Sequence, residues 1–221
     1  MAGILFIISA PSGSGKSTLV AQLRTLVEGL DFSVSYTTRA PRGSETDGRE
    51  YHFTDRPTFE QMTVRGEFLE WAEVFGNYYG TALSALDHAR EAGKDLLLDI
   101  DVQGAKQIME KLPSAVSIFI LPPSPQVLEM RLRQRSEAEH VTSEEVIERR
   151  LQQARSEIEQ VWDYRYALVN DVLDQAVAEM RAVVLQERGG RDGVTAVAES
   201  CRTSARSPRL CAALASFNVP C

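Results

Sequence analysis

Cysteine is absent from the first 200 residues of this chain of 221, and the three cysteines present are Cys201, Cys211 and Cys221. The body of the chain can therefore hold neither a disulfide nor a cysteine-ligated metal ion, which is typical of proteins of a reducing cytosol. The three terminal cysteines have no histidine near them in the sequence, so we expect no metal site there either.

Long apolar runs and an excess of positive charge are also missing. No apolar run approaches the roughly 18 residues of a membrane span, and no basic flank precedes the short N-terminal apolar run as it would in a secretory signal. Lysine and arginine number 24 against 31 acidic residues, which gives a formal net charge of −7. A general binder of nucleic acid or of membrane surfaces would favour the opposite sign. We therefore expect a cytoplasmic protein that binds neither nucleic acid nor membranes. The formation of a homo-oligomer is compatible with the sequence.

The sequence alternates signals for buried strands and for amphipathic helices. The continuous apolar run at 4–8 predicts a strand covered on both faces, 96–100 and 116–121 are two more runs typical of buried strands, and a last strand is expected at 166–169. Helices are expected between and after them, at 16–28, 102–112, from 124, at 142–162 and at 172–188. This alternation predicts a three-layer α/β fold with a parallel central sheet and helices on both faces.

Two segments interrupt the alternation. Residues 36–82, rich in threonine, arginine, glycine, tyrosine and glutamate, predict a small mixed α/β lobe inserted after the second strand. Residues 136–143 are polar and acidic and predict a short lid. We expect one domain over 1–188 and a poorly ordered tail over 189–221, because the tail is rich in serine, arginine and alanine and has weak periodicity. Within the tail, 210–219 fits either a weak helix or disorder.

The most specific motif is a glycine-rich run between a predicted strand and a predicted helix, Ala10-Pro11-Ser12-Gly13-Ser14-Gly15-Lys16-Ser17-Thr18. Glycines let backbone N–H groups converge on an anion, and the helix N-terminus adds a positive partial charge. Lys16 would bridge the terminal phosphates of a nucleoside triphosphate, and the Ser17 hydroxyl would ligate Mg²⁺. Ala10 stands where the strict pattern has glycine. The run predicts a phosphate-binding loop, which GTPase switches, ATP motors and small-molecule kinases all share.

A second group of motifs lies in the inserted lobe and just after it. Arg39 and Arg42 are three positions apart, and paired guanidinium groups suit a phosphate monoester held bidentately. Asp99 and Asp101 alternate at the end of a buried strand, where carboxylates of a parallel sheet face the ligand crevice. Between them come Tyr51 and the runs Phe68-Leu69-Glu70-Trp71 and Gly76-Asn77-Tyr78-Tyr79-Gly80-Thr81.

With these motifs the sequence resembles the guanylate kinases, from about Gly3 to Glu187. The resemblance rests on the phosphate loop, Ser-x-Thr-Thr-Arg-x-x-Arg, Gly-Asn-Tyr-Tyr-Gly-Thr and Leu-Asp-Ile-Asp-x-Gln-Gly. It implies a P-loop nucleoside monophosphate kinase of the bacterial type, which transfers the γ-phosphate of ATP to GMP and dGMP with Mg²⁺, in purine nucleotide metabolism and GMP recycling. Ser136 departs from the family, which usually has glycine after the arginine at the position of Arg135.

The resemblance also implies roles for individual residues. The GMP phosphate is expected on Arg39, Arg42, Tyr51 and Tyr79, and the guanine on Ser35, Glu70, Thr81 and Asp101. Asp99 is expected in the GMP site near Lys16 and Mg²⁺, with Ser17 and Asp99 as the metal ligands. ATP is expected on residues 10–18, Arg135 and Asn170, the last on the adenosine side. Catalysis is expected from Lys16, Arg39, Arg131, Arg135 and Arg150.

The chemistry of the bases agrees with the expected guanine site. Guanine presents N1–H and N2–H donors on its pairing edge, whereas adenine presents an N1 acceptor. An ionised carboxylate only accepts hydrogen bonds, so Glu70 and Asp101 would attract guanine and repel adenine. A buried polar mismatch of this kind gives discrimination of order 10⁴. The hydroxyl of Ser35 or of Thr81 could serve guanine O6.

Two alternatives stay open on the residues alone. A sugar-phosphate kinase on the same scaffold would keep the phosphate loop but would have no need of Glu70 and Asp101. A non-catalytic interaction module resembling the guanylate kinases would usually have a degraded loop, whereas Lys16 and Ser17 are intact here. A GTPase switch would need an Asn-Lys-x-Asp run, which the sequence lacks.

Overall fold

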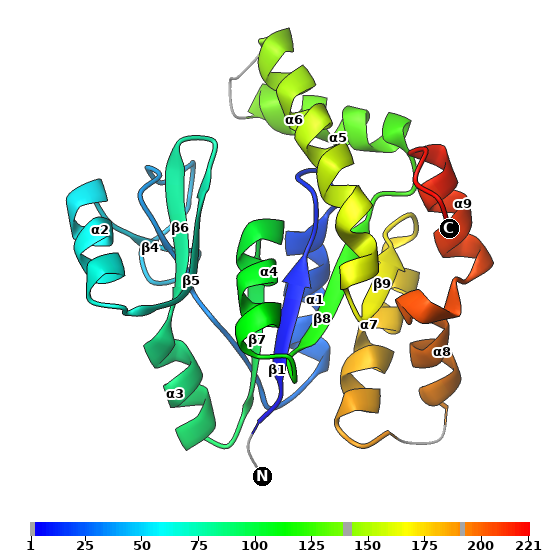
Figure 1. The fold of residues 1–221 in the computed structure, drawn as a ribbon, viewed down its shortest axis with the longest axis horizontal. Helices are drawn as coiled ribbons and strands as arrows, with labels where there is room; N and C mark the ends of the chain where they lie inside the picture. The colour runs from blue at the N-terminus through cyan, green and yellow to red at the C-terminus, as the bar shows by residue number, and fades with distance from the viewer. Residues whose placement is uncertain (1–2, 139–142, 191–192) are drawn as a thin grey trace. The chain divides into compact units, whose positions relative to one another are not determined.

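The structure, a computed structural model, describes residues 3–138, 143–190 and 193–221. The chain divides into two compact units (Figure 1). The first unit comprises Met1–Ile7 and Gly29–Ala115, and the second comprises Ile8–Glu28 and Val116–Cys221. Among the helices of the described residues, none is long and apolar enough to cross a lipid bilayer.

Five strands form a sheet in the order β2-β7-β1-β8-β9. Their bounds are β1 Leu5–Ser9, β2 Leu30–Phe32, β7 Asp95–Ile100, β8 Val116–Leu121 and β9 Tyr166–Val169. Strand β2 pairs with β7, and β8 with β9, in parallel. Strands β1, β8 and β9 are buried throughout, which is why their sequences are mostly apolar. The predicted α/β fold with a parallel central sheet is confirmed, and the four strands given bounds from the sequence agree with the observed ones to within one residue.

In the first unit, the lobe predicted at 36–82 contains a second sheet in the order β4-β3-β6-β5. Its elements are β3 Tyr36–Thr37, β4 His52–Phe53, α2 Arg56–Val64, β5 Phe68–Val74 and β6 Asn77–Ala82. Strands β5 and β6 form an antiparallel hairpin, and Phe59, Met62 and Phe68 make a small core beside it. Helices α3 Leu83–Glu91 and α4 Val102–Lys111 complete this unit, and α4 packs against β5.

The second unit carries the remaining helices. They are α1 Lys16–Leu26, α5 Pro125–Ala138, α6 Glu144–Ile158, η1 Glu159–Asp163, α7 Leu173–Glu187, α8 Thr195–Ser200, η2 Thr203–Ala205 and α9 Pro208–Ser216. Helix α1 packs against α7, and α5 packs against α6. Of the lid predicted at 136–143, residues 139–142 lie outside the described part of the chain.

The C-terminal segment differs from the poorly ordered tail that the sequence predicts. Residues 193–221 form α8, η2 and α9, with α8 against α7 and α9 against β9, at the orange-to-red end of the ribbon in Figure 1. Helix α9 begins after Ser207, whose hydroxyl accepts from Leu210 N, and has proline in its first turn. Its apolar stripe, Leu210, Ala213, Leu214 and Phe217, is buried. Because the stripe is short and lies among small residues, the composition of the segment did not predict a packed helix.

Two further features stabilise this segment. A disulfide joins Cys211 of α9 to Cys221, a pairing that the sequence did not predict. Upstream of it, Ala167 N donates to the carbonyl of Cys201 at 2.8 Å, and Thr203 N donates to the carbonyl of Arg165 at 3.1 Å. The segment therefore supplies backbone partners to β9, which is the last strand of its sheet and would otherwise present an open edge.

Candidate active site

The phosphate loop lies between β1 and α1 and needs glycine at two positions. Gly13 and Gly15 have φ angles of 88° and 83°, a region that side chains rarely adopt. Gly15 is also the N-cap of α1, and among the described residues no side chain caps this helix. The first turn, Lys16 to Thr18, carries no acidic residue. Neither a capping side chain nor an acidic residue of this turn therefore competes with an anion for the positive end of α1.

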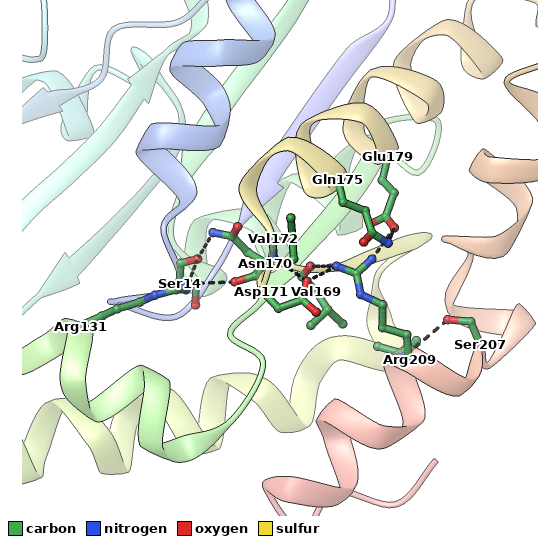
Figure 2. Close-up of polar contacts among 11 residues, drawn as sticks. Ser14, Arg131, Val169, Asn170, Asp171, Val172, Gln175, Glu179, Ser207 and Arg209 are labelled. Carbon is green, nitrogen blue, oxygen red and sulfur yellow. Dashed lines mark hydrogen bonds and ion pairs between the residues drawn. The ribbon is translucent and has the colours of Figure 1, made fainter.

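Two residues from other parts of the second unit, Asn170 and Arg131, contact this loop (Figure 2). Asn170, which directly follows β9, donates from Nδ2 to the carbonyl of Ser14 at 2.7 Å. Arg131 of α5 donates from Nη2 to the carbonyl of Asn170 at 3.0 Å and from Nη1 to that of Ser14 at 3.4 Å. A Cβ atom on Gly15 would lie 2.4 Å from Asn170 Nδ2, so this close approach also requires glycine. The structure brings together Arg131, Asn170 and the loop, which the sequence placed in one site only by resemblance.

The other two arginines expected at the triphosphate lie on α5 and α6. Arg135 is exposed in the last turn of α5. Arg150 of α6 donates from Nη1 to the hydroxyl of Ser136 at 3.1 Å, and Ser136 is buried. The serine that departs from the family pattern therefore contacts one of the expected catalytic arginines. Arg133, which sequence reasoning missed, joins α5 to α6 through Glu144 at 2.8 Å.

In the first unit, Arg39 lies in a cluster with Tyr51, Tyr79 and Glu45. The sequence analysis did not single out Glu45. The Arg39 side chain is buried and donates from Nη2 to Glu45 Oε1 at 2.9 Å. Glu45 Oε2 accepts from the backbone N–H of Arg42 at 2.8 Å, while the Arg42 side chain is exposed. Burial works against the charge of Arg39, but the contacts with Glu45 and Tyr79 outweigh it, so the pKa of its guanidinium lies above the ordinary value. The only sequence signal for Glu45 was its place three residues after Arg42, at the start of a segment that also contains Asp47 and Glu50.

Tyr51 and Tyr79 complete this cluster. Their ring centroids are 5.9 Å apart in an edge-on arrangement, and the Arg39 guanidinium lies 5.3 Å from the centroid of Tyr51. Burial, and then the charge of Asp99, raise the pKa of Tyr51 to about 12, so its hydroxyl stays a hydrogen-bond donor at neutral pH. Arg39, Tyr51 and Tyr79 thus gather donors suited to a phosphate group. Tyr78, in contrast, packs against Phe59 in the lobe core, with centroids 5.3 Å apart.

The expected base-reading residues also lie together in the first unit. Glu70 of β5 is only 3% exposed and stands opposite Thr81 of β6 in the hairpin register. Burial, reinforced by the Asp101 carboxylate, raises the pKa of Glu70 to about 7. The hydroxyl and the backbone N–H of Thr81 act against this rise, because both donate toward the Glu70 carboxylate.

Asp101 has a structural role beside the expected one. It is the N-cap of α4, where its carboxylate accepts from Gly104 N at 2.9 Å. A Cβ atom on Gly104 would lie 2.2 Å from Glu70 Oε2, so this glycine is what allows the Glu70 carboxylate to approach the start of α4. The sequence reading quoted Gly104 in the Asp-x-Gln-Gly motif but gave it no role. Ser35 is also buried, and its carbonyl accepts from His52 N at 2.9 Å.

Comparison with known proteins gives consistent matches. A family model described as guanylate kinase matches residues 3–187. A guanylate kinase of Koribacter versatilis is 56% identical over 211 residues, which is 96% of this chain and 90% of that protein. One of Nitrosospira multiformis is 48% identical over 186 residues, 84% of this chain and 87% of that protein. The crystal structure of guanylate kinase from Anaplasma phagocytophilum matches with a TM-score of 0.70 and 33% identity, over 86% of this chain and 88% of that chain.

Proposed function

Because the chain belongs to the guanylate kinase family, we propose that its second unit holds ATP and its first unit holds GMP. The enzyme transfers the γ-phosphate of ATP to GMP, which gives ADP and GDP, and we propose dGMP as an equivalent acceptor. We further propose a cytoplasmic location, with these small molecules rather than nucleic acid or membrane as its partners.

On the donor side, backbone N–H groups of residues 10–18 and the N-terminus of α1 bind the ATP phosphates. Lys16 bridges the β- and γ-phosphates, where charge develops during transfer. Arg131, Arg135 and Arg150 neutralise the remaining charge, and Asn170 supports the loop from the adenosine side. The absence of an acidic residue from the first turn of α1 supports this assignment, because no fixed carboxylate there competes with the phosphates.

On the acceptor side, Arg39, Arg42, Tyr51 and Tyr79 hold the GMP phosphate. Glu70 and Asp101 accept the N1–H and N2–H protons of guanine, and the hydroxyl of Thr81 or of Ser35 donates to O6. The buried Glu70 carboxylate, with the Asp101 carboxylate near it, is the observation that carries the choice of guanine. A sugar phosphate offers no N–H donors to such a carboxylate, and a buried acceptor without a matching donor costs about 1–3 kcal/mol.

The residues proposed to hold a magnesium ion carry the oxygen donors that this ion prefers. In the described part of the chain, no group of three or more histidine, cysteine or acidic side chains could form a closed cation site. A magnesium ion in a kinase needs only one or two protein oxygens, because phosphates and water supply the rest. We propose the hydroxyl of Ser17, exposed in the first turn of α1, and the carboxylate of Asp99, at the end of β7. When bound, the ion would neutralise charge on the β- and γ-phosphates.

The residues promote the transfer by position and charge. An oxygen of the GMP phosphate attacks the γ-phosphorus in line, and this oxygen is already anionic, so no strong general base is required. Lys16 and the arginines stabilise the charge that develops on the transferred group. Exclusion of water from the bound substrates would prevent ATP hydrolysis.

ADP release, measured with MgATP and each of GMP, dGMP, AMP and ribose 5-phosphate, tests this proposal. We expect rapid turnover with GMP and dGMP and a kcat/KM for AMP lower by about 10⁴. A Lys16→Ala variant should lose about 10²–10³ in kcat, the loss typical of a donor that stabilises transition-state charge. Turnover of the sugar phosphate in preference to GMP would favour the alternative kinase, and binding without any turnover would favour an interaction module.

A further inference from the structure

The side chain of Arg209 connects the C-terminal segment to the strand end behind the phosphate loop. Arg209 lies in the first turn of α9 and reaches three acceptors from two other elements (Figure 2). It donates to the carbonyl of Val169, the last residue of β9, at 2.5 Å. It also forms ion pairs with the carboxylates of Asp171 and of Glu179 on α7. A forked guanidinium is suited to such a set of acceptors, whereas an ammonium group is not.

The residue between two of these acceptors is Asn170. Its side chain is buried and holds the carbonyl of Ser14 in the phosphate loop, while its own carbonyl accepts from Arg131. Arg209 therefore holds the chain on both sides of Asn170, at the carbonyl of Val169 and at the carboxylate of Asp171. A displacement of the 169–171 segment would move the group that supports the loop.

Asp171 links Arg209 to Arg131 by charge as well as by position. The Asp171 carboxylate is close enough to Arg131 for its charge to act on that guanidinium, against the burial that lowers the pKa of Arg131. Although burial would raise the pKa of Asp171, the hydrogen bonds from Arg209 and from Val172 N lower it below the ordinary value. Arg209 thus partly neutralises the carboxylate whose charge acts on Arg131.

We propose that Arg209 is a positioning residue for the ATP side of the site, acting through Asn170 and Asp171. The proposal rests on the proposed function, because it requires ATP to bind at the phosphate loop beside Arg131. It gives the C-terminal segment a role in substrate affinity in addition to its cover of the β9 edge. The segment lies beyond residue 187, where the match to the family model ends.

The rest of the segment is anchored independently of Arg209, which makes the side chain a fair target for substitution. The Thr203 hydroxyl donates to the carbonyl of Tyr164 at 2.7 Å, and the backbone of Cys201 accepts from Ala167. The apolar stripe of α9 and the disulfide hold the other end. A matched control exists in Arg206, an exposed arginine of the same segment that lies over the ring of Trp162 at 5.2 Å.

The test compares Arg209→Gln, Arg209→Lys and Arg206→Gln in the full-length chain by steady-state kinetics, calorimetric binding of a non-hydrolysable ATP analogue, and thermal unfolding. We expect Arg209→Gln to raise KM for ATP and Kd for the analogue about tenfold, with KM for GMP changed by less than about twofold. Arg209→Lys should lie between Arg209→Gln and the unchanged protein, and Arg206→Gln should leave both constants unaltered. Asp171→Asn in the Arg209→Gln background should recover part of the loss, because the amide still accepts from Val172 N but no longer attracts Arg131.

Each result has a defined reading. Unchanged ATP constants in Arg209→Gln, or an equal rise in KM for GMP, would overturn the positioning role, and a fall in Tm alone would make Arg209 purely structural. A double variant as impaired as the single one would overturn the part of the proposal that concerns the charge of Asp171. Failure of the unsubstituted protein to turn over GMP would contradict the proposed function instead, and the analogue titration would still measure the effect of Arg209.

Discussion

Glu45 holds Arg39 by a hydrogen-bonded ion pair of 2.9 Å, and the same carboxylate accepts from the backbone of Arg42 at 2.8 Å. One acidic side chain therefore fixes both the guanidinium group and the loop that carries the expected phosphate-binding arginines. The Arg39 side chain is only 8% exposed, so its charge depends on this partner. Arg39 is thus fixed in its orientation before any phosphate arrives.

We predict that Glu45→Ala raises KM for GMP about tenfold or more, because a misplaced binding group costs up to about a hundredfold. KM for ATP should stay within about twofold. Glu45→Gln keeps one acceptor oxygen, replaces the other with an amide donor and removes the charge, so its KM for GMP should fall between those of the unsubstituted protein and Glu45→Ala. The measurement is steady-state kinetics with each substrate varied in turn. An Ala variant that binds GMP more tightly would show instead that Glu45 competes with the phosphate.

The raised pKa of Glu70 predicts a pH dependence of GMP use. Only the ionised carboxylate accepts both guanine protons, and with a pKa of about 7 this form is lost as the pH falls through neutrality. KM for GMP should therefore rise by up to about tenfold for each pH unit below 7 and level off above it, while KM for ATP follows no such course.

Glu70→Gln is the control for this pH dependence, because the phosphate of GMP has its own pKa of about 6. The variant cannot titrate at position 70, so any slope that it retains belongs to the phosphate. We expect a higher KM for GMP and a shallower profile between pH 5.5 and 8.5. Superimposable profiles of the two proteins would show that Glu70 does not control recognition of the base.

Gly104→Ala should damage the guanine side of the site specifically. The new Cβ atom would lie 2.2 Å from Glu70 Oε2, so the carboxylate or the start of α4 must shift. We expect KM for GMP to rise about tenfold and selectivity over AMP to fall, with a loss of stability of about 1–3 kcal/mol from the forced fit. Denaturant unfolding and the ADP-release assay measure the two effects. Retention of full GMP selectivity would mean that Glu70 can move without consequence.

The Cys211–Cys221 disulfide should stabilise the C-terminal segment under oxidising conditions. It closes a short loop of sequence separation 10, for which chain-entropy arguments give about 3 kcal/mol at most. Replacing both cysteines by serine should lower the free energy of unfolding by up to this amount. A reductant should lower Tm of the unsubstituted protein but not of the double-serine variant. Equal sensitivity of the two proteins to the reductant would show that the bond contributes nothing.

The sequence predicted the structure near the N-terminus better than that of the C-terminal segment. The phosphate loop could be predicted because its function depends on backbone geometry, which glycines at 13 and 15 and a following helix specify locally. The buried strands could be predicted because strands covered on both faces consist mostly of apolar residues. The C-terminal helices were missed, since their stability comes from contacts with α7 and β9 that leave only a short apolar pattern in the sequence.

Neighbouring residues and short fixed spacings were enough to predict the alternating α/β fold, the glycine-rich loop between β1 and α1, and the residue types expected at a guanine site. Only the tertiary structure decided that Glu45 holds Arg39, that Gly104 admits the Glu70 carboxylate, and that Arg209 reaches across from α9 to the chain on either side of Asn170. Those relationships depend on how separate elements pack together. The burial of these side chains and the charges near them follow from that packing rather than from the order of residues.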